Sequence, residues 1–287
     1  MNVLTTVRRM RAAVRRARGS DKTIGLVPTM GALHEGHLSL IDAARSACRF
    51  VVVSLFVNPT QFGPNEDFPS YPRTPAADQA ACRDRGADAV FMPSVQEMYG
   101  EGSPTEVRVR QLSETLCGAG RPGHFTGVCT VCAKLFHIVQ PDKAFFGAKD
   151  FQQTAVLKRM VADLNFPLEI VVCPTVREAD GLAMSSRNAY LSPAERSQAP
   201  ALHAAIGLAK ELILRDRPPA ATVIEAMRAR LAERAPDGRI EYIQIVDPER
   251  LRDVESTDGP VLVALAVRLG PARLIDNALV DAGSRGP

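Results

Sequence analysis

Two histidines, His34 and His37, are the residues of this sequence whose type and spacing most clearly indicate chemistry. They follow an apolar run and a glycine-containing turn, and they open a segment with helical periodicity. Histidines three positions apart share one face of a helix, and free backbone N–H groups at a helix N-terminus attract anions. Two imidazoles there could donate hydrogen bonds to phosphate oxygens and stabilise the charge that develops on phosphorus. We therefore expect a phosphate-handling site at this turn.

A partial metal site and simple surface polarity are the alternatives for the histidine pair. Catalytic zinc normally takes three protein ligands, and no His-Glu-x-x-His spacing is present. The chain has only five histidines. Two of them at one strand-to-helix turn therefore favour a functional role over either alternative.

Two further polar clusters follow apolar runs. In Phe145–Gln153, Lys149 could hold phosphates as a point charge, although Asp150 and Gln153 also have the spacing of a purely structural helix cap. In Ala183–Asn188, two serine hydroxyls and a guanidinium could bind a polyphosphate. This second signal is weak alone, because serine-rich loops are common at domain boundaries.

Neutral amides mark a different kind of subsite. Asn58 and Gln61 follow the apolar run Phe50–Val57. They suit a substrate with hydroxyl and carboxylate groups better than they suit a phosphate. Arg121 and His124 add cationic character on another loop.

A glycine pattern at Gly118, Gly120 and Gly123 matches the dinucleotide-binding motif only superficially. The preceding Ser113–Cys117 looks more helical than stranded, and Pro122 interrupts the turn, so no dinucleotide site is expected there. The sequence has no phosphate-binding P-loop motif either. Any ATP must therefore be bound without one.

The elements that must position these clusters alternate between short, almost unbroken apolar runs and helical patterns. Such runs are typical of strands buried on both faces of a parallel sheet, and their alternation with helices predicts βαβ units. The predicted fold is therefore α/β, a Rossmann-like doubly wound parallel sheet, with a half-exposed extra strand at Thr105–Val109. The expected strands are Thr23–Pro28, Phe50–Val57, Ala89–Met92, Lys143–Phe146 and Glu169–Cys173, and the expected helices include Leu38–Ala47, Ala76–Arg85 and Phe151–Ala162.

A domain boundary is expected near Asn188–Ser192, which predicts domains at residues 1–187 and 188–287. Ser192–Glu195 has the sequence of a capping box with proline at the first helical position. We expect a long helix from there to about Leu214 and, after Pro218 and Pro219, another to about Arg234. Strands at Arg239–Val246 and Val261–Val267 would complete a smaller C-terminal α+β domain, and the tail after Asp281 is expected to fray.

Composition excludes several classes of protein. The 287 residues carry 35 basic and 32 acidic side chains, and a net charge of +3 is too small to indicate nucleic-acid or membrane binding. No apolar run approaches the roughly 18–20 residues that span a bilayer. Residues 1–18, with six arginines and no acid, resemble a transit peptide, but Val3, Met10 and Val14 at helical spacing favour a first helix. We expect a cytoplasmic protein.

The six cysteines are then expected to be reduced thiols. Cys129 and Cys132 have the spacing of half a zinc or redox motif. Because no second pair and no nearby histidine pair accompanies them, a buried apolar stripe explains them better.

Taken together, the segments resemble the pantothenate synthetase (pantoate–β-alanine ligase) family. Gly25–His37 is similar to the HxGH-type ATP signature of that family. Other similar segments occur in the same order, so the resemblance covers nearly the whole chain: Val57–Phe62, Arg121–Phe125, Phe145–Gln153, Met184–Arg187 and Arg273–Asn277. The resemblance implies a homodimeric enzyme that condenses pantoate with β-alanine through pantoyl adenylate, using ATP and Mg²⁺.

The resemblance also implies roles for individual residues. Gln61 and Gln153 would bind pantoate, with Gln61 also beside β-alanine, and His37 would be the proton donor. Lys149 would supply the charge of the lysine that the Met-Ser-Ser-Arg loop lacks. The residues expected to contact ATP are Met30, Gly31, Ala32, Leu33, His34, Glu35, Gly36, His37, Gly147, Ala148, Lys149, Asp150, Val176, Met184, Ser185, Ser186 and Arg187.

Two other functions remain as alternatives from the residues alone. A nucleotidylyltransferase would share the histidine pair, but it would need extra cations for a second phosphate, where this chain has Asn58, Gln61 and Gln153. A nucleotide-sensing or RNA-binding module would use the basic first helix. The low aromatic content, 5% with no Trp, argues against recognition by base stacking.

Overall fold

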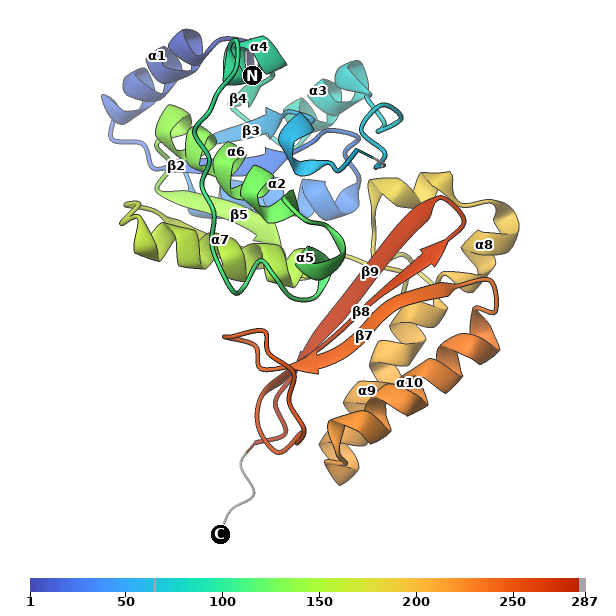
Figure 1. The fold of residues 1–287 in the computed structure, drawn as a ribbon. Coiled ribbons are helices and arrows are strands. Elements are labelled where there is room, and N and C mark those ends of the chain that lie inside the picture. The colour runs from blue at the N-terminus through green and yellow to red at the C-terminus, as the bar shows by residue number, and fades with distance from the viewer. Residues whose placement is uncertain (65, 284–287) are drawn as a thin grey trace. The chain divides into compact units, whose positions relative to one another are not determined.

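The structure, a computed structural model, describes residues 1–64 and 66–283 (Figure 1). It divides into two compact units, each assembled from more than one stretch of chain. The first unit comprises Met1–Ser113, Arg121–Ala148 and Gln153–Pro174. The second comprises Glu114–Gly120, Lys149–Gln152 and the chain from Thr175 onward. A functional division between residues 187 and 188 stays a prediction.

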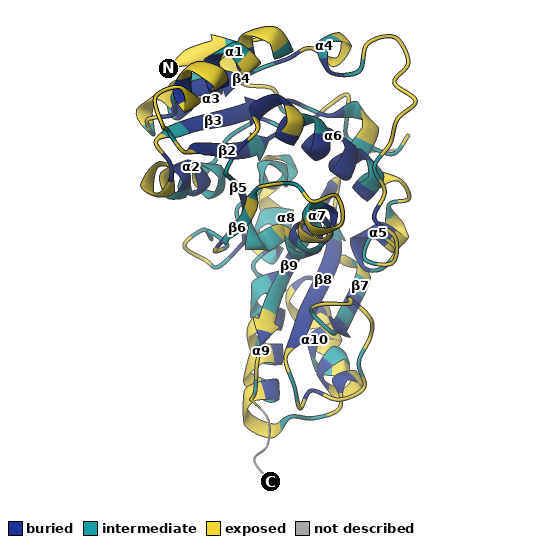
Figure 2. Ribbon diagram, turned by 90° about the vertical axis from the view of Figure 1, so that its left-hand side faces the viewer, coloured by how far each residue is buried: buried dark blue, intermediate teal, exposed yellow. Residues whose placement is uncertain are grey.

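The first unit contains a six-stranded, wholly parallel sheet. A parallel sheet was predicted from the sequence, with five of these six strands. The strands lie in the order β1-β4-β3-β2-β5-β6. Their bounds are β1 (Asn2–Leu4), β2 (Ile24–Thr29), β3 (Phe50–Leu55), β4 (Ala89–Phe91), β5 (Lys143–Gly147) and β6 (Glu169–Cys173). The central strands are almost wholly buried (Figure 2), because helices cover both faces and leave no solvated side for alternating polar residues.

Helices on both faces make the fold doubly wound. On one face lies α2 (Glu35–Ala47), with α3 (Pro75–Asp84) packed beside it, and their apolar side chains join those of β2, β3 and β4 in one core. α1 (Val7–Arg18) and α6 (His124–Val139) pack against each other and against β2. The other helices are α4 (Val95–Tyr99) and α7 (Phe151–Asp163), with short 3-10 helices η1 (Pro59–Gln61) and η2 (Ala148–Asp150).

The strand order places a topological switch point between β2 and β5. From β2 the chain continues to β3 and β4 on one side, whereas β5 and β6 extend the sheet on the other. β2 pairs with β5 through Leu26 and Ala144. Ligands of open α/β sheets bind outside the carboxyl ends of the strands at such a point. The segments after β2, β3 and β5, which the sequence singled out, therefore leave the sheet at this edge.

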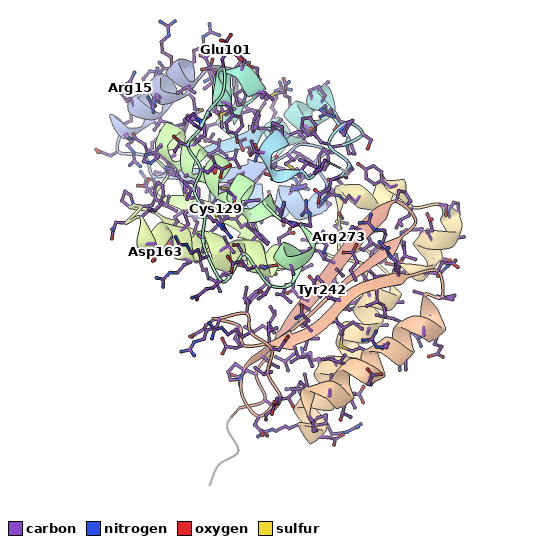
Figure 3. All side chains as sticks on the ribbon, viewed as in Figure 1. Arg15, Glu101, Cys129, Asp163, Tyr242 and Arg273 are labelled. Atoms are coloured by element: carbon purple, nitrogen blue, oxygen red, sulfur yellow. The ribbon has the colours of Figure 1, made fainter. Side chains whose placement is uncertain are left out.

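The basic N-terminal segment is a helix with a solvated face, as expected, but it is shorter than predicted. Met10, Ala13, Val14 and Ala17 are buried, while the arginines, such as Arg15 in Figure 3, cover the outer face. The helix begins only at Val7. The preceding residues form β1, which pairs in parallel with β4.

The cysteine pair lies inside α6, where the predicted apolar stripe places it. Cys129, labelled in Figure 3, and Cys132 are at most 4% exposed. Burial raises the pKa of the Cys129 thiol to about 12. All six cysteines of the described chain are free thiols.

The extra strand expected at Thr105–Val109 was predicted wrongly. No strand is formed there. The backbone N–H of Val107 donates instead to the Thr130 hydroxyl of α6 at 3.0 Å. The segment thus satisfies its backbone on a helix side chain, and the apolar alternation reflects packing on α6 rather than strand pairing.

The second unit contains the small α+β domain that the sequence predicts. Three antiparallel strands, in the order β7-β8-β9, pack on two helices. The strands are β7 (Arg239–Val246), β8 (Val261–Leu269) and β9 (Ala272–Val280), and the helices are α5 (Cys117–Gly120), α8 (Pro193–Gln198), α9 (Ala201–Asp216) and α10 (Ala220–Arg234), with η3 (Ser186–Tyr190). No helix in residues 1–64 and 66–283 is long and apolar enough to cross a bilayer.

Two details of this unit differ from expectation. The capping box of Ser192 and Glu195 is present, but the single long helix is divided into α8 and α9. Pro200 precedes α9 and has no N–H to continue the hydrogen-bond ladder. β9 was not predicted, because Arg273, Asp276 and Asn277 interrupt its apolar pattern. Of the tail expected to fray, residues 284–287 lie outside the described chain.

Candidate active site

The turn between β2 and α2 has an unusual backbone. Gly31 and Ala32 are consecutive left-handed residues, with φ values of 84° and 49°. The Gly31 N–H donates to the Thr29 hydroxyl at 3.2 Å, which itself donates to the carbonyl of Ser54 on β3. The turn is therefore tied to the neighbouring strand before the helix begins.

The two histidines at the start of α2 stack against each other. Their ring centroids are 4.1 Å apart. His34 is the N-cap residue, and its Nδ1 accepts from the Gly36 N–H at 3.1 Å, while His37 Nδ1 accepts from the His34 N–H at 3.4 Å. A neutral imidazole with an accepting Nδ1 carries its proton on Nε2. Both rings therefore carry an N–H donor on Nε2.

Several backbone N–H groups at this helix N-terminus already have partners within the protein. The N–H groups of Ala32 and Leu33 donate to Asp78, and those of His34 and Gly36 donate to the histidine rings. The amides are used to orient the imidazoles. The imidazole Nε2 positions are therefore candidate donors for an anion.

Asn58, which follows β3, is buried and has a fixed amide orientation. Its Oδ1 accepts from the Tyr99 hydroxyl at 2.6 Å and from the Thr60 hydroxyl at 3.0 Å. Its Nδ2 donates to the Gly127 carbonyl at 3.2 Å. Because a carbonyl can only accept and Nδ2 can only donate, the Asn58 side chain cannot be flipped without losing these bonds.

The fixed Asn58 amide orients Gln61 in turn. Asn58 Nδ2 also donates to Gln61 Oε1 at 3.0 Å, which leaves Gln61 Nε2 against the Met30 sulfur at 3.2 Å. Thioether sulfur is a weak acceptor. Gln61 thus has an amide donor beside the turn that carries the histidines, and a substrate oxygen would be a better acceptor than the sulfur.

Gly127 allows η1 to pack closely on α6. A Cβ atom at this glycine would lie 2.3 Å from the Thr60 carbonyl oxygen and 2.6 Å from the Gln61 nitrogen. No side chain is possible at such distances without movement of the backbone. The amide pair of Asn58 and Gln61 therefore depends on a glycine at this position.

Arg121 and His124 also contact the Gln61 backbone. Arg121 forms a bidentate pair with Glu66, with two N–O distances of 2.6 Å. His124 Nδ1 lies 2.8 Å from the Gln61 carbonyl, which can only accept, so this nitrogen carries the proton. His124 Nε2 then accepts from Arg121 at 2.9 Å. The Arg121 charge is largely balanced by Glu66, which suits a scaffold for Gln61 better than a free substrate cation.

Glu66 is predicted to make a pH-dependent contribution to stability. Burial opposes its ionisation, but hydrogen bonds and the charge of Arg121 outweigh burial and lower its pKa to about 2 from the usual 4.5. This contribution is fully present above about pH 4.5 and is lost as the pH falls towards 2. We expect Glu66→Gln to lower the free energy of unfolding at neutral pH by at most about 3 kcal/mol, with a difference from wild type that shrinks below about pH 4.5.

Urea unfolding of both proteins at several pH values checks this expectation. Glu225→Gln is the matched control, since Glu225 is exposed on α10 and forms only a loose pair with Arg228. A constant difference between wild type and Glu66→Gln from neutral to acidic pH would contradict the assigned role.

In the second unit, β9 holds the segment that contains Lys149. The Asn277 side chain donates to the Lys149 carbonyl at 2.7 Å. The adjacent Asp276, 3% exposed, accepts two hydrogen bonds from Arg177, at 2.7 and 2.8 Å. Arg177 also forms an isolated β-bridge with Ala183. One short stretch of β9 thus positions both the predicted lysine and the base of the serine-rich loop.

The serine-rich loop has a defined conformation within this unit. The Met184 N–H donates to the Val176 carbonyl at 3.0 Å, so two of the predicted ATP-contacting residues are neighbours. Ser185 caps η3 by accepting from the Arg187 N–H at 3.3 Å. Asn188 bonds to Glu178 and closes the loop.

The glycine pattern is divided between the units, with Gly118 and Gly120 in the second and Gly123 in the first. No strand precedes it, and Gly118 and Gly120 are part of α5. The Cys117 sulfur at the start of α5 lies 3.2 Å from the Tyr242 hydroxyl of β7 and 3.5 Å from the Arg273 guanidinium of β9, both labelled in Figure 3. The Cys117 N–H donates to Gln152 Oε1 at 3.0 Å. This segment serves packing.

The predicted site residues fall into two groups, one in each unit. The first unit contains Met30–His37, Asn58, Gln61, Arg121, His124, Gly147, Ala148 and the half-buried Gln153 of α7. The second contains Lys149, Asp150, Val176 and Met184–Arg187. Within the first group, Glu35 uses its carboxylate in an exposed ion pair with Arg85.

Several supporting residues were missed by sequence reasoning. These residues are Asp78, Tyr99 and Glu66. Each contacts a residue that lies 30 to 60 positions away in the sequence. Asp276, at 3% exposure, was visible only as a charge inside an otherwise apolar run. That interruption is a usable signal, since a carboxylate is almost never buried without a partner.

The fold and the first-unit geometry are those of an α/β protein with a candidate ligand site at the switch point of a doubly wound sheet. The family model of pantoate-beta-alanine ligase matches residues 2–279. The chain therefore belongs to the pantoate–β-alanine ligase family. It is a ligase of pantothenate biosynthesis that joins pantoate to β-alanine.

Individual relatives agree over almost the whole chain. Pantothenate synthetase of Moorella thermoacetica is 54% identical over 281 residues, covering 98% of this chain and 99% of the relative. The enzyme of Thermotoga neapolitana is 51% identical over 98% of this chain and all of the relative. The Thermus thermophilus pantothenate synthetase structure superposes with a TM-score of 0.92 at 46% identity, covering 97% of this chain and 99% of that one.

A fourth relative carries ligands. The structure of pantoate-β-alanine ligase from Francisella tularensis, described as complexed with β-γ ATP and β-alanine, has a TM-score of 0.79 at 32% identity and covers 97% of each chain.

Proposed function

We propose that the chain makes pantothenate in two steps, of which the first consumes ATP. In the first step, a carboxylate oxygen of pantoate attacks the α-phosphorus of ATP, which gives pantoyl adenylate and releases pyrophosphate. In the second step, the β-alanine amine attacks the acyl carbon, the bond to AMP breaks, and pantothenate forms. The family membership and the ATP and β-alanine complex of the Francisella tularensis relative support this scheme.

The first step is supported by the position of the proton on each of the two imidazole rings. Their Nδ1 atoms accept from backbone N–H groups, so both rings carry donors on Nε2. A carboxylate that approaches a triphosphate is an anion approaching an anion, so the site must supply positive charge and hydrogen-bond donors before attack. We assign His37 as the proton donor to the phosphate oxygens, with His34 beside it.

Charge neutralisation would come from the other group of residues. Lys149 and Arg187 would neutralise the triphosphate, and the other residues of Gly147–Asp150, Val176 and Met184–Arg187 would contact the nucleotide. Both cations belong to segments with a fixed backbone, since Asn277 holds Lys149 and Ser185 caps the turn of Arg187. Such backbone restraint lowers the entropic cost of positioning the charges.

Mg²⁺ is part of the proposal. Among residues 1–64 and 66–283, no group of three or more His, Cys, Asp or Glu is placed to hold a metal. Mg²⁺ usually takes one or two carboxylates together with substrate phosphates and waters. Asp150, exposed beside Lys149, would supply one carboxylate, and the ion would neutralise phosphate charge.

The acid and the amine would be held by neutral groups. Gln61 has its amide N–H beside Met30, where it can donate to a pantoate oxygen without adding charge, and we assign Gln153 the same role. Asn58 fixes Gln61, while Arg121 and His124 anchor its backbone. The anhydride is already activated, so the amine step needs positioning more than acid–base help. We also propose that the enzyme works as a homodimer in the cytoplasm.

Pyrophosphate exchange tests the proposed first step. Labelled pyrophosphate should enter ATP when the enzyme, Mg²⁺ and pantoate are present and β-alanine is omitted. Exchange should stop without pantoate, and addition of β-alanine should release AMP. Exchange without pantoate, or a product that retains AMP, would point to a nucleotidylyltransferase and overturn the proposal.

A further inference from the structure

Asp78 of α3 binds the backbone of the turn that precedes the histidine pair. Its Oδ2 accepts from the Ala32 N–H at 3.0 Å, and its Oδ1 accepts from the Leu33 N–H at 2.9 Å. The side chain is buried, with 4% exposure. One carboxylate therefore fixes two consecutive amides of a segment more than 40 positions earlier in the chain.

The turn requires such a partner because its backbone is strained. Ala32 adopts a left-handed conformation, with φ at 49°, which an L-residue with a Cβ atom adopts only at an energetic cost. Successive N–H groups in this kind of turn form a concave nest that attracts anions. In this chain the nest is filled by the protein's own carboxylate. A phosphate is therefore not needed to hold the turn in shape.

Asp78 acts on the turn rather than on its own helix. It lies in the first turn of α3, where an acidic side chain commonly caps backbone N–H groups. Its carboxylate oxygens instead accept from the β2–α2 turn and from the Thr74 hydroxyl at 3.1 Å. Thr74, the N-cap residue of α3, makes no side-chain cap of its own. The Asp78 side chain thus binds the backbone of the β2–α2 turn instead of capping the first turn of α3.

The position of this turn determines where the imidazoles lie. Leu33 directly precedes His34, the N-cap residue, and His34 Nδ1 and the His34 N–H form the bonds that orient both rings. A shift of the Ala32 and Leu33 amides would therefore move both Nε2 donors. Catalytic groups that are misplaced by about 1 Å lose on the order of 10²-fold in rate.

We propose that Asp78 is a positioning residue for catalysis, which holds His34 and His37 in place through the left-handed turn. This proposal rests on the role assigned to the two histidines above. Asp78 takes no part in proton transfer in this scheme. Its effect passes through two backbone amides.

Asp78→Asn is the direct test, because the variant keeps the shape of the side chain but replaces one accepting oxygen with a donor. We expect the maximum rate of pantoate-dependent pyrophosphate exchange to fall by about 20-fold or more, with the KM for pantoate changed less than about threefold. Asp88→Asn is the matched control. Asp88 also accepts a backbone N–H, from Val51 at 2.8 Å, but lies at the start of β4, away from the turn.

Two further variants separate positioning from folding. Adding Ala32→Gly to Asp78→Asn removes the strain of the left-handed residue, so the double variant should regain part of the lost rate. If Asp78→Asn does not fold, Thr74→Val removes a single hydrogen bond to the same carboxylate and should show a smaller loss of the same kind, in maximum rate rather than in KM.

The possible results distinguish failure of the Asp78 proposal from failure of the proposed adenylate step. Asp78→Asn and Asp88→Asn with equal exchange rates, at a temperature where both are folded, would overturn the proposal. So would a Thr74→Val variant with an unchanged maximum rate, where only that variant folds. A wild-type enzyme that shows no pantoate-dependent exchange would instead refute the adenylate step, and Asp78 would then be judged by the same comparison in overall pantothenate formation.

Discussion

Replacing His37 with alanine is expected to slow pantoyl-adenylate formation by on the order of 10²-fold or more. The His37 ring carries its proton on Nε2, because Nδ1 accepts from the His34 N–H. Alanine removes this donor from the site where negative charge develops, and it also removes the capping-box bond from the His34 N–H. Single-turnover formation of the adenylate, measured with pantoate and ATP before β-alanine is added, reports the step directly.

His137→Ala provides the matched control. His137 lies on the exposed side of α6, where its ring contacts Phe166, and its removal should leave the adenylation rate unchanged. A His37→Ala enzyme that forms the adenylate within about threefold of the wild-type rate would remove His37 from the chemistry.

Gly127→Ala is expected to have the second large effect, on both activity and stability. The new Cβ atom would lie 2.3 Å from the Thr60 carbonyl oxygen, so η1 and α6 must separate. Overpacking of this kind costs about 1–3 kcal/mol or more. The same movement breaks the bond from Asn58 to the Gly127 carbonyl and releases Gln61. We expect the KM for pantoate to rise by roughly tenfold or more, since a lost hydrogen bond in a buried polar group costs about 1–3 kcal/mol.

Gly207→Ala is the matched control for this substitution. Gly207 lies inside α9, and a Cβ atom there would meet nothing within 4 Å. Alanine should therefore stabilise the protein by up to about 1 kcal/mol and leave the KM for pantoate unchanged. Thermal unfolding and steady-state kinetics of both variants provide the comparison. A Gly127→Ala enzyme with wild-type Tm and KM would contradict the close packing of η1 on α6.

Much of the fold could be predicted because its signals are local. Strands buried on both faces read as short apolar runs, and β2 to β6 all appeared where such runs occur. β1 was not predicted, because its three residues are exposed or half-buried and directly precede a segment with a helical pattern. A strand was wrongly predicted at Thr105–Val109, because an irregular segment that packs along a helix can also alternate polar and apolar residues.

The site could be predicted only in part, for a related reason. His34, Lys149 and Gln61 stand out because each follows a strand end, and the loops after strands of a parallel sheet share one edge. The groups that orient them are not marked in this way. Asp78 appears in the sequence as an ordinary acidic residue at the start of a helix, and its amide partners are set by how α3 packs beside α2. Long-range contacts of this kind leave no periodic trace in a single sequence.

The discontinuous make-up of the second unit limits how the protein can be divided. Its chain includes Lys149–Gln152 and Glu114–Gly120, which are inserted far upstream of the rest, and Asn277, Tyr242 and Arg273 bind them to its sheet. Truncation after Pro174 would remove the residues of β7 and β9 that bind these two stretches. Neither half can be obtained by a single cut, so recombination of parts from two relatives must exchange three stretches together.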